Sequence, residues 1–244
     1  MRELSTVPLV DDVFDRLPLG MQKRLFPVIR PRTWWALEKR RRLPIGAKGG
    51  LAAFDRDRCI FIHVPKTAGY SIGQALFGGV TGHDPLQRLW LFYTPEKFDQ
   101  YFKFAIVRNP WERLVSAYVY HMQDRHSPAV QTWVRQQFGG FADFDEFVRH
   151  WVPQRAIRSE RMHFRPQSYF ITLGGRVGVD FLGRMETLEE DFATIARRLG
   201  REVSLPRLNA TPRERPYRDY YTAVSRQIVA DVYAEDIQRF GYQF

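Results

Sequence analysis

The chain has 244 residues, of which 44% are hydrophobic and 15% aromatic, a length and composition that exclude a disordered chain and are typical of one globular domain. Its net charge is +10, from 37 Lys and Arg against 27 Asp and Glu, which suits a polyanionic partner such as nucleic acid, an anionic membrane, a phosphorylated nucleotide or an acidic glycan. The one cysteine, Cys59, excludes an intramolecular disulfide, and no apolar stretch reaches the ~18 residues that a membrane span requires.

The first 54 residues include a cationic cluster with a tryptophan pair, between Arg30 and Leu43. Two interpretations stay open for this segment: a helix packed on the domain with a solvated basic face, or a surface that contacts an anionic membrane or an acidic acceptor. Acidic residues interrupt the apolar residues near the start of the chain, so we expect no secretory signal and a cytoplasmic location, with peripheral membrane contact open for residues 30–43. We predict a basic N-terminal extension, residues 1–54, followed by one globular domain, residues 55–244.

The first buried strand is predicted over Cys59–Val64, six residues with almost no polar side chain. It ends in a turn that carries Lys66 and Thr67, and a helix is predicted to begin near Ser71. The N–H groups at a helix start have no partner within the helix and carry partial positive charge. Together with the Lys66 ammonium and the two hydroxyls, they form a cradle for an anion.

A second segment repeats this arrangement 42 positions later, counted from Lys66 to Arg108. An apolar strand is predicted from Phe102, with Arg108 at its end, a turn at Pro110 and then a helix that carries Ser116. An Arg side chain presents a planar fork to phosphate oxygens, and a Ser in the following helix adds a hydroxyl. The chain therefore predicts the succession of strand, anion site and helix twice.

The remaining elements complete an alternating pattern. Asp143 is predicted to cap a helix that runs through Trp151, and residues 177–185 read as a further strand. A capping-box pattern at Thr187 opens another helix, and one last helix is predicted from about Thr222 to Phe240. Strands that alternate with helices favour an α/β fold with a mostly parallel central sheet flanked by helices.

A kinase or ATPase P-loop needs Gly-x-x-x-x-Gly-Lys-Ser/Thr, which this chain lacks, because Lys66 precedes the small residues. Instead, residues 65–72 (Pro-Lys-Thr-Ala-Gly-Tyr-Ser-Ile) and 108–118 (Arg-Asn-Pro-Trp-Glu-Arg-Leu-Val-Ser-Ala-Tyr) resemble the two nucleotide-binding motifs of sulfotransferases that use 3′-phosphoadenosine-5′-phosphosulfate (PAPS). The resemblance is to the carbohydrate sulfotransferases of the chondroitin and dermatan type and their bacterial relatives. It implies a P-loop-like core, a sulfotransferase domain over residues 55–244, and transfer of a sulfuryl group from PAPS, as co-substrate, to a carbohydrate or other hydroxyl acceptor, with release of 3′,5′-ADP.

The resemblance also assigns residues to the site. Lys66 would stabilise the leaving phosphate oxygen, and Arg108 and Ser116 would hold the 3′-phosphate. The 5′-phosphosulfate would be bound by the loop residues Lys66, Thr67, Ala68, Gly69, Tyr70, Ser71 and Ile72. The acceptor hydroxyl needs a general base; His83 is the first candidate and Glu186 the alternative, whereas His63 and His121 read as structural and Arg113 is undecided.

Two other functions stay as alternatives. A P-loop-type nucleotide phosphotransferase would need a Walker-type loop and carboxylates for magnesium, and a reaction independent of divalent cations would argue against it. A basic nucleic-acid-binding module would show salt-sensitive duplex binding, but no module signature is present, so no nucleic-acid partner is expected. No His, Cys or carboxylate cluster has metal-ligand spacing, so no metal is expected.

Overall fold

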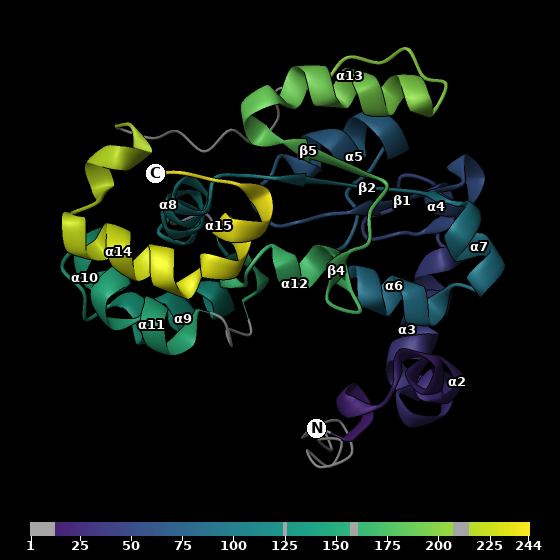
Figure 1. Cartoon of the computed structure of the whole chain (residues 1–244), viewed down its shortest axis with the longest axis horizontal. Helices are drawn as coiled ribbons and strands as arrows, with labels where there is room; N and C mark the ends of the chain where they lie inside the picture. The colour runs from purple at the N-terminus through teal and green to yellow at the C-terminus, as the bar shows by residue number, and fades with distance from the viewer. Residues whose placement is uncertain (1–12, 124–125, 157–160, 207–214) are drawn as a thin grey trace.

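The computed structural model describes residues 13–123, 126–156, 161–206 and 215–244. A parallel three-stranded sheet runs through its centre, with β2 (Phe102–Val107) between β1 (Cys59–Ile62) and β5 (Phe181–Arg184) (Figure 1). Cys59 lies opposite Phe102, and Phe104 lies opposite Phe181. Every side chain of β1 is buried, as is usual for a parallel strand covered on both faces. The predicted α/β fold with a parallel sheet flanked by helices is confirmed.

Helices fill the connections between the strands. Before β1 the described residues include α2 (Leu19–Ile29), α3 (Pro31–Arg41) and α4 (Ala52–Asp57). Between β1 and β2 lie α5 (Gly69–Phe77), α6 (Leu86–Phe92) and α7 (Pro95–Gln100). Between β2 and β5 lie α8 (Pro110–His121), α9 (Pro128–Phe138), α10 (Phe144–His150), α11 (Val152–Arg155), the short helix η1 (Met162–Phe164), α12 (Ser168–Ile171) and the hairpin of β3 (Thr172–Leu173) with β4 (Arg176–Val177). After β5 come η2 (Met185–Thr187), α13 (Leu188–Arg198), η3 (Tyr217–Tyr220), α14 (Ala223–Val232) and α15 (Ala234–Phe240).

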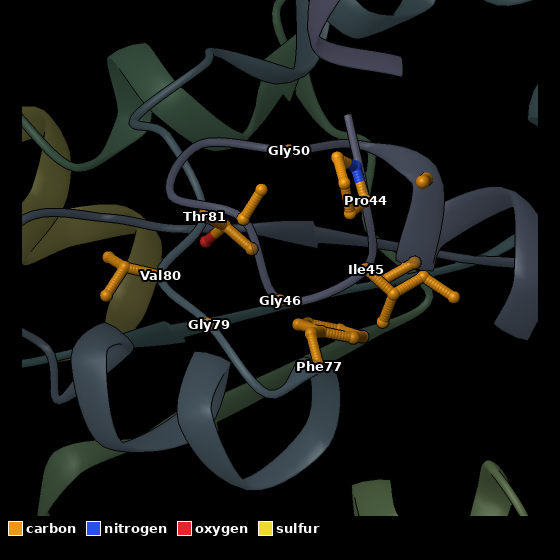
Figure 2. A pocket seen from close by; sticks show the side chains of 11 residues that line it. Pro44, Ile45, Gly46, Gly50, Phe77, Gly79, Val80 and Thr81 are labelled. Atoms are coloured by element: carbon orange, nitrogen blue, oxygen red, sulfur yellow. The ribbon is translucent and has the colours of Figure 1, made fainter. Parts of the chain in front are cut away.

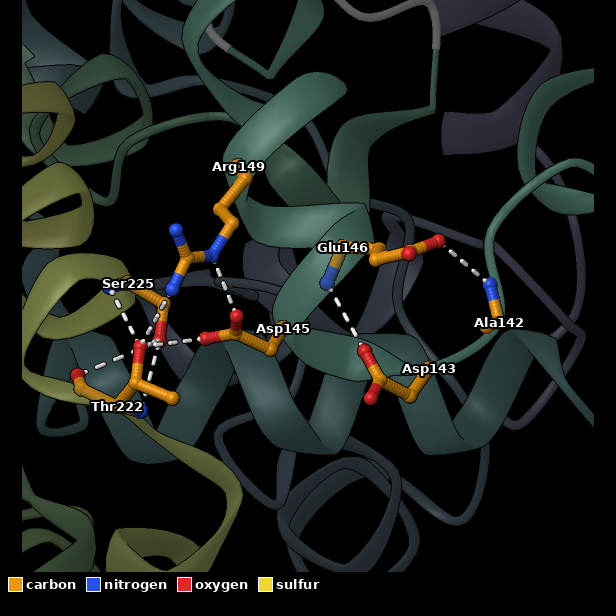
Figure 3. A network of polar contacts seen from close by, with 7 residues as sticks. All are labelled: Ala142, Asp143, Asp145, Glu146, Arg149, Thr222 and Ser225. Carbon is orange, nitrogen blue, oxygen red and sulfur yellow. Dashed lines mark hydrogen bonds and ion pairs between the residues drawn. The ribbon is translucent and has the colours of Figure 1, made fainter.

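Two apolar cores hold these elements together. The first surrounds the sheet and includes side chains from α2, α3, α5 and α13. The second lies among α8, α10, α11 and α14, which gather at one end of the molecule (Figure 1). A polar network closes the second core at its surface, where the Asp145 carboxylate accepts from Arg149 Nε at 2.5 Å and from Thr222 Oγ1 at 2.7 Å (Figure 3). This network holds the start of α14 against α10.

The N-terminal helices are packed on the first core. Phe26 of α2 and Leu37 of α3 are buried, and Trp34 makes edge-to-face contacts with Phe26 and with Phe92 of α6. On its inner side, α3 also holds Asp55 through Arg41 Nε at 2.5 Å. The inward side chains of this segment are therefore packed on the domain, as the first interpretation expects. The domain boundary at residue 54 stays a prediction. In the ranges that the structure describes, no helix combines the length and the apolarity needed to cross a membrane.

Two predicted details are wrong. Thr187 does not form a capping box, because its hydroxyl donates to the Asp191 carboxylate at 2.7 Å. The last helix is not continuous but is divided at Tyr233, whose backbone leaves the helical region at φ −108° and ψ 26°. The buried Tyr233 hydroxyl donates to the Phe164 carbonyl at 2.7 Å, and Asp236 in α15 accepts from the backbone N–H groups of residues 167 and 168. These bonds hold the two helices on either side of the break against residues 164–168. In contrast, Asp143 caps α10 by accepting from Glu146 N, as predicted.

Candidate active site

The loop that follows β1 turns sharply to begin α5 at Gly69. Lys66 and Ala68 adopt the left-handed region, with φ of 71° and 57°, a conformation that costs a residue with a side chain of order 1 kcal/mol or more. Thr67 is fully buried, and its hydroxyl donates to the Val64 carbonyl at 2.8 Å, which holds the turn closed. The first N–H groups of the nine-residue helix α5 point back toward this turn. Thr67 is therefore a structural part of the loop as well as a member of the predicted anion site.

Arg108, at the end of β2, joins the second predicted motif to the first. Its side chain is only 9% exposed, and its Nη1 donates to the Lys66 carbonyl at 3.2 Å. Its Nη2 donates to Glu112 at 2.8 Å, while Nε is buried without a hydrogen-bond partner among the described residues. The Gln167 side chain bonds both backbone groups of Arg108, at 2.9 and 2.8 Å. The structure thus brings together the two motifs that lie 42 positions apart.

Asn109 and Glu186 fix the start of α8. The Asn109 side chain accepts from Trp111 N at 3.1 Å and Glu112 N at 3.4 Å, which caps the helix. Glu186, the alternative candidate for the general base, accepts from Asn109 N at 2.9 Å and from the Tyr242 hydroxyl at 3.1 Å. These bonds give Glu186 a structural task. Ser116 lies farther along α8 and is nearly buried, on the same helix that carries Glu112.

Arg113, which the sequence left undecided, connects three segments around the Lys66 loop. Its guanidinium is buried and donates to the carbonyls of Pro65 at 3.4 Å, His163 at 3.1 Å and Arg165. Burial lowers the pKa of Arg113, although Tyr233 and Asp236 nearby act in the opposite direction. The Arg113 side chain therefore joins the Lys66 loop to the segment of His163 and Arg165 through backbone carbonyls.

His83 lies directly over the end of β1. Its Nδ1 is 2.8 Å from the His63 carbonyl, and because a carbonyl only accepts, Nδ1 carries the hydrogen. The neutral ring then has its lone pair on Nε2. Burial lowers the pKa of His83 and the Lys66 charge adds to that effect, whereas the His63 carbonyl and Asp84 raise it. The net lowering favours the neutral ring, which is the form that a general base needs.

His63 supports His83 and explains a glycine in the loop. The two imidazole rings lie 4.1 Å apart between centroids, and His63 Nδ1 is 3.2 Å from the Thr81 carbonyl. A Cβ atom on Gly69 would lie 1.9 Å from His63 Cδ2. Burial lowers the pKa of His63 to about 3, so this ring stays neutral. The first turn of α5 can approach the ring only because residue 69 has no side chain.

Lys66, Tyr120 and His163 complete the cluster. The Lys66 ammonium lies 4.2 Å from the centroid of the Tyr120 ring, which attracts a cation. The His163 ring lies 5.0 Å from that of Tyr120 and 5.9 Å from that of His83. His163 Nδ1 is 2.9 Å from His121 Nε2, so one of these nitrogens donates to the other. Within the described part of the chain, no group of His, Cys, Asp and Glu is arranged to hold a metal ion.

Sequence reasoning missed Tyr120 and His163. Tyr120 reads as one more aromatic residue of a helix, and His163 lies outside both motifs. His163 lies four residues before Gln167, whose side chain bonds both backbone groups of Arg108.

A pocket lies between the segment around Ile45 and the residues that follow α5, apart from the predicted anion site (Figure 2). Its walls are backbone and mainly apolar side chains, including Ile45, Phe77 and Val80, together with Thr81. No charged side chain lines it, and neither Lys66 nor Arg108 takes part. This pocket therefore does not suit an anion.

Comparison with known proteins identifies the family. The profile of the sulfotransferase family matches residues 51–243, which is most of the chain. The chain belongs to the sulfotransferase family. Carbohydrate sulfotransferase 10 of Xenopus laevis is 28% identical over 178 residues, covering 61% of this chain and 49% of that protein. The protein of the same name from Gallus gallus is 26% identical over 185 residues, covering 61% and 48%.

An uncharacterized protein of Archaeoglobus fulgidus is 32% identical over 104 residues, covering 42% of this chain and 71% of that protein. The chain spans about half the length of the two carbohydrate sulfotransferases that it matches. No solved structure matches it significantly.

Proposed function

We propose that this sulfotransferase moves a sulfuryl group from PAPS to a hydroxyl of a carbohydrate acceptor and releases 3′,5′-ADP. The observation that carries the proposal is the hydrogen bond from Arg108 to the Lys66 carbonyl, which unites two anion-binding motifs at the ends of neighbouring parallel strands. Nucleotides bind at this end of open parallel sheets. The acceptor class is supported by relatives named carbohydrate sulfotransferase, at 26–28% identity.

The side chains at the site fit a donor that carries phosphate at two ends. The Lys66 loop and the start of α5 would bind the 5′-phosphosulfate, through residues 66–72. Arg108 would bind the 3′-phosphate together with Ser116, and its buried Nε offers a donor that has no protein partner among the described residues. Glu112 now shares the Arg108 guanidinium, so a bound phosphate would compete with this carboxylate.

In the proposed reaction the acceptor oxygen forms a bond to sulfur while the bond from sulfur to the phosphate oxygen breaks. His83 Nε2 takes the proton of the acceptor hydroxyl, since its lone pair is free when Nδ1 donates to His63. Lys66 stabilises the negative charge that develops on the departing phosphate oxygen. Removing one such preorganised charge partner costs about 3 kcal/mol in comparable sites, or about a hundredfold in rate.

Thermal unfolding with and without 3′,5′-ADP tests the donor site. Ligand at a hundredfold over its Kd adds ~2.7 kcal/mol, a rise in Tm of roughly 5–10 °C for a chain of this length. We expect the rise to be lost in Arg108→Ala and reduced in Lys66→Ala, each compared with its own ligand-free Tm. Arg135→Ala, an exposed change on α9, serves as the control. No rise in the folded wild-type protein at saturating ligand would overturn the proposal.

Transfer of label from radioactive PAPS to glycans then tests turnover. We expect transfer to continue in the presence of a chelator, because the described site holds no arrangement of side chains for a metal ion. Loss of transfer in His83→Ala with 3′,5′-ADP binding retained would support its role as the base. Retention of the full rate in His83→Ala would exclude that role.

A further inference from the structure

The N-terminal helices carry most of the excess charge of the protein. Residues 13–45 contain nine Lys and Arg against two Asp and Glu, so this segment contributes +7 of the net +10. Both acidic side chains lie close to cations of the same segment: Asp15 is 2.9 Å from Arg30, and Glu38 is 3.8 Å from Arg41. The outer surface of the segment is therefore strongly cationic.

The same helices expose the most prominent apolar side chains of the described chain. Val28 is 76% exposed and Trp35 64%, and both exceed every other exposed large hydrophobic residue. Met21 is 49% exposed and lies seven residues before Val28 on α2. Gln22 and Phe26, on the opposite side of α2, are buried. Large apolar side chains that gather on one exposed face indicate an interaction surface.

Cations and apolar side chains share the outward stripe of each helix. On α2, Arg24 lies between Met21 and Val28 at helical spacing. On α3, Arg32, Trp35 and Lys39 follow at intervals of three and four, all of them exposed. The two helices are separated by one residue and pack through Phe26 and Trp34, at the edge of the molecule away from α10 and α14 (Figure 1).

We propose that the outward face of α2 and α3 docks on an anionic lipid surface. Helices that lie in a membrane interface place cations at the lipid headgroups and aliphatic and Trp side chains at the acyl boundary. Cations and Trp35 alone would also suit an acidic polysaccharide. Val28 and Met21 decide between these partners, since an aliphatic side chain gains free energy in an acyl boundary and little on a hydrated glycan. The proposal does not depend on the reaction proposed above.

Co-sedimentation of the full chain with vesicles tests this surface. We expect binding to vesicles of phosphatidylcholine with phosphatidylglycerol, weaker binding at higher salt, and none to phosphatidylcholine alone. Lys39→Glu should weaken binding at least about fivefold, the worth of one cation near an anionic surface. Val28→Ser should weaken it as well, because it removes an apolar contact and leaves the charge of the face unchanged.

Matched substitutions on other helices distinguish binding through this face from binding through the net charge of the protein. Val224→Ser, at a valine 49% exposed on α14, and Arg197→Glu, at an exposed arginine on α13, should bind like the wild type. Equal losses in the controls, or no binding to anionic vesicles, would overturn the proposal. So would vesicle binding that Lys39→Glu weakens and Val28→Ser leaves unchanged, the pattern expected for dextran sulfate, since that result indicates a purely electrostatic face. Circular dichroism of each variant verifies that it is folded.

Discussion

Replacing Gly69 by alanine should displace the His63 ring and disturb the site that depends on it. The new Cβ would lie 1.9 Å from His63 Cδ2 and 2.1 Å from Nε2, whereas ordinary contact begins near 3.4 Å, so the ring would have to move by about 1.5 Å. Overpacking of this kind costs about 1–3 kcal/mol. For a chain of this length the expected fall in Tm is roughly 2–10 °C. Gly20→Ala is the matched control, since a Cβ there meets nothing within 4 Å.

The decisive measurement is a double-mutant cycle in urea. His63→Ala removes the obstructing ring, so Gly69→Ala in that background should cost nothing or stabilise by up to about 1 kcal/mol, the usual gain of alanine in a helix. The coupling between the two positions should then be about 1–4 kcal/mol. A Gly69→Ala variant as stable as the wild type, or a cost that remains in the His63→Ala background, would refute the reasoning.

Three further predictions follow from contacts of the site. Arg40→Met should lower the rate of sulfuryl transfer without an equal loss of donor binding, because Arg40 Nη2 donates to the carboxylate of Asp84, the neighbour of His83, at 2.6 Å. The control is Arg42→Met, which removes a 76% exposed side chain from the same segment and should leave the initial rate of transfer unchanged. Burial lowers the pKa of His121 to about 3, while an unfolded histidine titrates near 6.5. The stability that depends on its neutral ring is therefore intact above about pH 6.5 and is lost as the pH falls toward 3. His121→Asn should reduce the pH slope of the unfolding free energy by up to about 1.4 kcal/mol per pH unit near pH 5. Urea unfolding at a series of pH values measures this slope, with the exposed His150→Asn as the control. Arg113→Met should destabilise the fold by about 2–4 kcal/mol, because it leaves the carbonyls of Pro65, His163 and Arg165 without their donor; an unfolding curve that matches that of Arg135→Met would contradict this.

Much of the sheet and the two loops of the proposed anion site could be predicted from local sequence. The apolar runs that became β1 and β2, the turns at Lys66 and Pro110, and the helix that carries Ser116 are signals that act over a few residues. Parallel strands place their carboxyl ends at one edge of a sheet, so the meeting of Lys66 with Arg108 followed from the predicted fold class. The sequence by itself therefore determined the strands β1 and β2, the fold class and the two loops for which anion binding is proposed.

Only the tertiary structure decided what surrounds those loops. His63, His83, His121 and His163 come from four separate segments, and no periodicity states which of them become neighbours. The break at Tyr233 was equally hidden, since the Tyr233 hydroxyl bonds the Phe164 carbonyl, 69 positions away. The choice of His83 over Glu186 as the candidate base depends on which carboxylate or ring the surrounding backbone already engages. Local patterns set secondary structure, whereas the protonation and orientation of a side chain are set by burial and by partners that only the folded chain brings within hydrogen-bond distance.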